Sequence, residues 1–189
     1  MKYQIIYADP PWKYNTSQHN GAGGTSTGGA HTHYSVLEDK EICKLPIQKL
    51  ADKNCLLFMW ATGPKLDIAF EVGRAWGFKY CTMGFVWDKG RDNPGTYTMS
   101  RCEFVLIFKK GKIPLPRGKR NIKQLISIKR DKHSSKPPQI REKIVELVGD
   151  KPRIELFGRA DNQENLFGFD KFRGWDVWGN EVKSDIKLT

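Results

Sequence analysis

The sequence lacks any apolar run long enough to cross a membrane, and it has few cysteines. Its four cysteines form no Cys-x-x-Cys pair and no spacing typical of a zinc site. These absences exclude a disulfide-rich secreted domain, and we expect a cytoplasmic protein with free thiols and no metal. It also lacks internal repeats, so we expect residues 1–189 to form one domain.

Acidic residues are nearly missing from one stretch, residues 109–132. This stretch holds ten Lys and Arg against a single acid, Asp131, and so carries +9 of the formal net charge of +11. A local excess of this kind suits contacts with the phosphates of a nucleic acid. A solvated basic loop would have the same composition, so the charge indicates a polyanionic partner without identifying it.

Apolar patterns of strand type and helix type alternate along the chain, which predicts an α/β fold. We expect a largely parallel sheet with helices on both faces. The polar stretches 13–34, 88–100 and 109–132 are predicted to be loops, the first flexible and the last basic. The expected strands are 3–8, 54–61, 78–87, 103–108, 125–128 and 153–157, and the expected helices are a Ser35–Glu38 capping box leading to Lys44, then 65–76 and 137–148.

The tetrapeptide Asp9-Pro10-Pro11-Trp12 directly follows the first expected strand, where α/β sheets place reactive groups. The amine of adenine is a poor nucleophile because its lone pair is delocalised into the ring. Two acceptors that each take a hydrogen bond from one of its N–H groups make that lone pair available. Asp9 supplies one acceptor, and the Pro10 carbonyl supplies the other. We expect Trp12 to offer a flat face on which a flipped base stacks.

This motif and a series of others resemble the MT-A70 family of S-adenosylmethionine-dependent N6-adenine methyltransferases. The resemblance covers nearly the whole chain and favours the bacterial and phage DNA-modifying members. It implies a Rossmann-like methyltransferase sheet in permuted order, with the catalytic motif before the cofactor motif. Its further segments are His33-Tyr34-Ser35, 57–63, Trp76-Gly77-Phe78, 86–89, 133–137, 155–159 and 174–181.

The resemblance also implies roles for individual residues. Asp9, Pro10, Pro11 and Trp12 are expected to form the catalytic motif. Lys136 is expected to meet the methionine carboxylate of the cofactor, and Arg159, Asn162, Asn180 and Glu181 to hold its ribose and nearby groups. The remaining cofactor contacts are expected from Ala8, Asp9, Phe157 and Gly158, and substrate contacts from Tyr14, His33 and Glu103. The basic stretch 109–132 adds Lys119 and Arg120 as expected substrate contacts, on the ground of its charge.

Several alternatives stay open at this point. The substrate could be RNA instead of DNA, or the chain could be a non-catalytic nucleic-acid-binding subunit, although an intact Asp9 motif argues against that. Methylation of a protein amide would more naturally use Asn at position 9. His31 and His33 suggest a substrate contact rather than a metal site, and Trp60, Trp76 and Trp87 are expected in the core. We expect a monomer or a homodimer.

Overall fold

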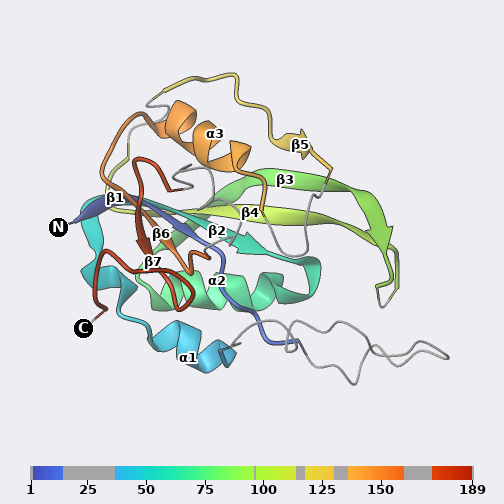
Figure 1. Ribbon diagram of the computed structural model, residues 1–189, viewed down its shortest axis with the longest axis horizontal. Coiled ribbons are helices and arrows are strands. Elements are labelled where there is room, and N and C mark those ends of the chain that lie inside the picture. Colours follow the sequence, from blue (N-terminus) through green and yellow to red (C-terminus); the bar gives the residue numbers. More distant parts are fainter. Residues whose placement is uncertain are drawn as a thin grey trace.

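A seven-stranded sheet in the order β5-β3-β4-β2-β1-β6-β7 runs through the computed structural model (Figure 1). The structure describes residues 2–14, 37–95, 97–113, 118–129, 136–159 and 172–188. The strands are β1 (Tyr3–Ala8), β2 (Ala51–Ala61), β3 (Lys79–Asn93), β4 (Ser100–Lys110), β5 (Leu125–Ser127), β6 (Arg153–Leu156) and β7 (Asp176–Trp178). The helices are α1 (Asp39–Lys44), α2 (Leu66–Ala75) and α3 (Gln139–Val148), with short 3-10 turns at Ile47–Lys49 and Gly63–Lys65.

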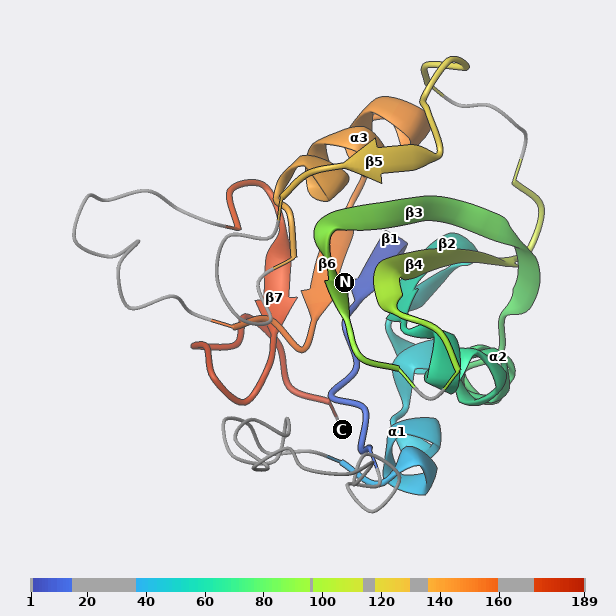
Figure 2. The ribbon, with the colours of Figure 1, turned by 90° about the vertical axis from the view of Figure 1, so that its right-hand side faces the viewer.

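Helices cover both faces of this sheet, as the sequence predicted (Figure 2). Successive residues of a strand point to opposite faces. Ile6 and Ala8 of β1 therefore join a core with Ile42 of α1 and Val72 of α2. The alternate residues Ile5 and Tyr7 of β1 join a second core with Ile140 and Ile144 of α3. Two apolar cores thus hold the central strands rigidly.

The three tryptophans expected in the core are buried there, since Trp60, Trp76 and Trp87 are at most 2% exposed. All four cysteines are free thiols, as expected. Within the described ranges, no helix is long and apolar enough to cross a membrane.

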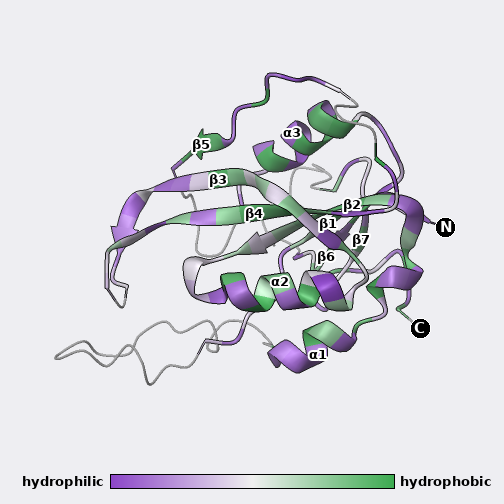
Figure 3. Ribbon diagram, turned by 180° about the vertical axis from the view of Figure 1, so that it is seen from behind, coloured by the Kyte–Doolittle hydropathy of each residue, from purple (hydrophilic) through white to green (hydrophobic). Residues whose placement is uncertain are grey.

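The sheet is largely parallel, as expected, with β4 as the exception. β4 runs antiparallel to both of its neighbours, β2 and β3, while the other pairs are parallel. The predicted loop at 88–100 is wrong over most of its length, because β3 continues to Asn93 and pairs there with Ser100. Polar side chains conceal this hairpin in the sequence, and Figure 3 shows the ribbon becoming hydrophilic as it leaves the sheet.

The first helix begins later than predicted. α1 starts at Asp39 with Glu38 as its N-cap residue, and the Glu41 carboxylate accepts a hydrogen bond from the Glu38 N–H at 2.9 Å. The capping box therefore joins Glu38 and Glu41, and Ser35 lies outside the described residues. The helix ends at Lys44, as expected.

A buried ion pair fastens α3 to the sheet. The Arg141 guanidinium donates to the Glu155 carboxylate of β6 at 2.8 Å, and both residues are below 10% exposed. The same guanidinium lies 5.8 Å from the ring centre of Tyr7 on β1. Since α3 begins just after Lys136, this contact fixes where that lysine meets the edge of the sheet.

Replacing one partner of this buried pair should be costly. Glu155→Gln leaves the Arg141 charge buried without its counter-ion, and we expect unfolding free energy to fall by about 3 kcal/mol. The matched control is Glu146→Gln on α3, whose pair with Lys119 is largely exposed and should cost less than about 0.5 kcal/mol. Urea unfolding measures the unfolding free energy of both variants. An equal decrease for Glu155→Gln and Glu146→Gln would contradict this account of α3.

Candidate active site

The Asp9 motif lies where β1 ends, between the ends of its parallel neighbours β2 and β6. The Asp9 N–H reaches the Leu156 carbonyl of β6 at 3.5 Å. The Trp12 N–H donates to the Pro10 carbonyl at 2.8 Å, which folds the motif into a tight turn. A carbonyl oxygen has two lone pairs, so the Pro10 oxygen keeps one for a further donor.

The structure corrects the expectation for Trp12. Its side chain is 5% exposed and its indole N–H donates to the Trp60 carbonyl of β2 at 3.2 Å. Trp12 therefore packs into the core and offers no open face for a base. An aromatic residue after a strand suggests stacking, yet here burial of the ring anchors the turn that carries Asp9.

Four charged side chains from four parts of the chain meet at this edge. The Lys136 ammonium lies 3.0 Å from an Asp9 carboxylate oxygen and 3.2 Å from a Glu103 oxygen. The Lys89 ammonium lies 3.3 Å from the other Glu103 oxygen. These side chains are between 9% and 19% exposed, and their formal charges cancel. We call Asp9, Lys89, Glu103 and Lys136 the charge cluster.

Opposite charges within the cluster keep Glu103 and Lys136 ionised despite burial. Burial raises the pKa of Glu103, but the ammonium groups of Lys136 and Lys89 outweigh burial and hold that pKa below its ordinary value. Burial lowers the pKa of Lys136, but Asp9 and Glu103 outweigh it and hold that pKa above its ordinary value. Glu103 and Lys136 therefore both carry their charges at neutral pH, although both side chains are largely buried.

The indole ring of Trp60 packs against the lysine of this cluster. The Lys136 ammonium lies 5.2 Å from the ring centre of Trp60, within the range of a cation–π contact. The indole N–H of Trp60 donates to the Tyr7 hydroxyl at 2.6 Å, which fixes the ring. Trp60 thus positions the lysine, although the sequence indicated only a core residue.

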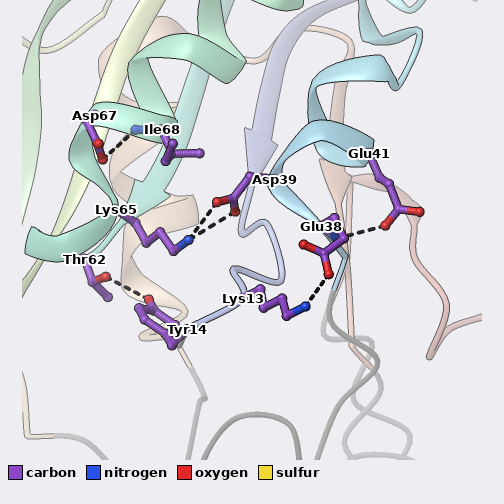
Figure 4. A network of polar contacts seen from close by, with 9 residues as sticks. All are labelled: Lys13, Tyr14, Glu38, Asp39, Glu41, Thr62, Lys65, Asp67 and Ile68. Atoms are coloured by element: carbon purple, nitrogen blue, oxygen red, sulfur yellow. Dashed lines mark hydrogen bonds and ion pairs between the residues drawn. The ribbon is translucent and has the colours of Figure 1, made fainter. Parts of the chain in front are cut away.

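A second network holds the segment just after the motif (Figure 4). The Lys13 ammonium pairs with Glu38, and the Tyr14 hydroxyl shares a 2.7 Å hydrogen bond with the Thr62 hydroxyl. At the start of α2, the Lys65 ammonium binds Asp39 at 2.8 Å. Chain segments on either side of the undescribed range 15–36 are therefore both fastened to the helices.

Tyr14, an expected substrate contact, stands beside the charge cluster. Burial raises the pKa of Tyr14 to about 12, partly offset by the Thr62 hydrogen bond and by the positive charge of Lys136. Its hydroxyl is therefore neutral at physiological pH and remains a donor as well as an acceptor. Glu103, another residue expected at the substrate, belongs to the cluster itself.

The expected cofactor residues gather where β6 and β7 end. The Gly158 N–H donates to the Trp178 carbonyl at 3.0 Å, and Arg159 and Glu181 form an isolated bridge. A Cβ atom on Gly179 would lie 2.3 Å from the Gly158 oxygen, so only glycine fits there. The structure thus brings the predicted Gly158, Arg159, Asn180 and Glu181 segments to one edge, next to Asp9.

Phe157 holds a strained conformation at this point. Its φ of 62° lies in the left-handed region, which is costly for a residue with a side chain. Contacts with Trp76 and Trp178, at ring distances of 6.5 and 5.4 Å, hold it in place. Such strain is common at binding sites, and here it turns the chain sharply into Gly158.

Sequence reasoning missed the residues that support the β7 end. The Ser184 hydroxyl both accepts from the Gly179 N–H and donates to its carbonyl, each at 3.1 Å. The Asp185 carboxylate accepts from the Val177 N–H at 2.8 Å. Nothing in the sequence singled out Ser184 and Asp185, because their hydrogen bonds to Gly179 and Val177 depend on how the chain folds back onto β7. Lys89 was missed as a site residue too.

Two expected substrate residues lie far from Asp9. The Lys119 N–H donates to the Glu146 carbonyl at 2.8 Å, so Lys119 and Arg120 lie beside the last turn of α3. Lys136 precedes the first turn, about 15 Å away along the helix. Lys119 and Arg120 lie far from Asp9 because β4 runs antiparallel to β2 and carries the chain to the opposite edge of the sheet before residue 111. His33 and Asn162 lie outside the described residues.

The comparisons with known proteins agree with this geometry. The sequence matches the MT-A70 family over residues 3–181. It is 42% identical to the Type II methyltransferase M.MunI of Mycoplasma sp, over 96% of this chain and 78% of that protein. It is 26% identical to the human N(6)-adenine-specific methyltransferase METTL4, and 26% to the human N(6)-adenosine-methyltransferase catalytic subunit METTL3.

The human proteins are much longer, since the match covers 37% of METTL4 and 28% of METTL3. In every case the matched region spans at least 95% of this chain. It includes the Asp9 turn, the charge cluster and nearly all of the β6–β7 edge. The chain belongs to the MT-A70 family.

Proposed function

We propose that the protein transfers a methyl group from S-adenosylmethionine to the exocyclic amine, N6, of adenine in DNA. The observation that carries this proposal is the Asp9 carboxylate, paired with Lys136 and carried on a tight turn beside the β6–β7 edge. DNA is the chosen polymer because M.MunI, which matches over most of both chains, is a Type II methyltransferase. The METTL3 match, which would favour RNA, covers only 28% of that protein.

The chemistry follows from the acceptors at the turn. Asp9 accepts one N–H of the adenine amine, and the free lone pair of the Pro10 carbonyl accepts the other. Both hydrogen bonds draw the nitrogen toward tetrahedral geometry and make its lone pair available. The new N–C bond would replace the S–C bond of the methyl donor, whose sulfur would leave as a neutral thioether. The amine nitrogen would then be positively charged, and Asp9 is the carboxylate placed to accept the proton that it loses.

The polar groups at the β6–β7 edge fit the cofactor. Gly158 and Gly179 let the ends of β6 and β7 pack closely, because a Cβ atom on either glycine would collide with Val177 or with the Gly158 backbone. Arg159, Asn180 and Glu181 add polar groups suited to ribose hydroxyls and a carboxylate. S-adenosylmethionine would supply there a methyl group on a positively charged sulfur, which needs no metal.

We assign Lys136 a different main role from the one the resemblance implied. Its ammonium already bridges Asp9 and Glu103, so it orients the Asp9 carboxylate. The Oδ1 atom of Asp9 faces Lys136. The other carboxylate oxygen is therefore the one that would face the adenine amine. Contact of Lys136 with the cofactor carboxylate stays a prediction, and it would require the ammonium to share a third anion.

Transfer of labelled methyl groups tests the proposal on both polymers. We expect incorporation from labelled S-adenosylmethionine into DNA that lacks N6-methyladenine, and little into RNA. Asp9→Ala removes the acceptor and should lower kcat on the order of 10²–10³-fold. Asp67→Ala, an exposed position on α2, is the matched control and should behave as wild type. Equal activity of Asp9→Ala and Asp67→Ala would overturn the role of Asp9.

The charge cluster predicts how stability depends on pH. Since the folded state holds the pKa of Glu103 below its ordinary value, ionised Glu103 stabilises the fold at pH above about 4.3. That contribution is lost as the pH falls through the lower folded pKa. Wild type should therefore exceed Glu103→Gln in unfolding free energy at pH 7, and the difference should shrink below about pH 4.3.

Urea unfolding of both proteins across pH 3.5–8, roughly the range that spans the ordinary glutamate pKa, measures this difference. A difference that stays constant or widens toward acid pH would show that Glu103 is not held ionised by its lysine neighbours.

A further inference from the structure

A large groove opens directly beside the charge cluster. Its volume is about 1040 Å³, and its walls are the Thr62–Pro64 turn on one side and the end of the β3–β4 hairpin on the other. Tyr14 and Lys89 line it, and both also border the charge cluster. The groove is therefore continuous with the site where the adenine amine must lie, and it is larger than most pockets for one small ligand.

The hairpin that forms one wall ends in exposed apolar side chains. Tyr97 is 98% exposed and Met99 is 60% exposed, and both line the groove. Figure 1 shows β3 and β4 projecting well beyond the rest of the sheet toward this tip. Large apolar side chains left in water at one point usually mark an interaction site.

The turn before this tip is tight. A Cβ atom on Gly95 would lie 2.4 Å from the Thr98 carbonyl oxygen, so the turn leaves no room for a larger residue. Farther back, the Arg101 guanidinium of β4 donates twice to the Asp88 carboxylate of β3, at 2.6 and 3.2 Å. This ion pair joins the two strands of the hairpin.

A nucleic-acid strand is the occupant that this combination fits. The target adenine must leave the base stack to reach Asp9, and its withdrawal unstacks the neighbouring bases. Proteins that unstack bases insert apolar side chains at the opened step, and aromatic rings bind single bases by stacking. Tyr97 and Met99 supply both side-chain types.

We infer that the groove beneath the β3–β4 hairpin binds the nucleotides that flank the target adenine, with Tyr97 and Met99 inserted at the unstacked step. This inference rests on the proposed function and names the element that recognises its substrate. Substrate recognition then lies with residues of a groove that reaches Lys89 of the charge cluster, and not with Lys119 and Arg120 beside the last turn of α3.

Kinetics of two substitutions at the tip test the stacking role. Tyr97→Ala should raise KM for DNA about 10-fold, whereas Tyr97→Phe keeps the ring and should stay near wild type. KM for S-adenosylmethionine should not change in either variant. Leu125→Ala is the matched control, because Leu125 is 60% exposed on β5 and does not line the groove. A Tyr97→Ala enzyme with an unchanged KM for DNA would overturn the inference.

Cross-linking separates this inference from the proposed function. With p-benzoylphenylalanine in place of Tyr97, irradiation should join the protein to DNA, and should do so equally in an Asp9→Ala background, in which methyl transfer is strongly reduced. The same probe at Leu125 should give little adduct. An adduct only with a second copy of the chain, or none with DNA, would contradict the inference. Adducts with DNA but no methyl transfer by wild type would instead contradict the proposed function.

Discussion

Two carboxylates and two ammonium groups share a nearly buried edge of the sheet, and each arrives on a different element. Asp9 follows β1, Glu103 starts the central part of β4, Lys89 lies on β3 and Lys136 precedes α3. Any one of these charges alone would be expensive to bury, and any three would leave a net charge. The fold must therefore bring all four together, which restricts how β1, β3, β4 and α3 pack.

That restriction explains features that otherwise look unrelated. β4 must run antiparallel to β2 for Glu103, near its start, to reach the edge where β1 ends. The buried Arg141–Glu155 pair holds α3 against β6 and so places Lys136 over Asp9. Trp60 lies under Lys136, and Trp12 holds the Asp9 turn by bonding to the Trp60 carbonyl. Residues that pack the core thus also set the direction of one carboxylate.

The sequence predicted the parts of the site that depend on strand ends. Asp9 after β1 and Gly158 after β6 could be placed because buried parallel strands read as short apolar runs whose carboxyl ends share an edge. Strand direction could not be read in the same way, and Lys119 was therefore placed near the substrate although β4 carries the chain to the opposite edge. The hairpin beyond Asp88 was missed because its exposed polar residues have no apolar alternation. Trp12 was misjudged since a ring that packs and a ring that stacks look identical in sequence.

The chemical position of the transferred methyl group tests the central claim most directly. DNA lacking N6-methyladenine is incubated with the protein and S-adenosylmethionine, digested to nucleosides and analysed by mass spectrometry against standards. An Asp9 carboxylate and a Pro10 carbonyl that accept the two N–H bonds of an adenine amine predict N6-methyl-2′-deoxyadenosine as the product. Methylation at a ring nitrogen or on cytosine, or no methylated nucleoside at all, would contradict the account.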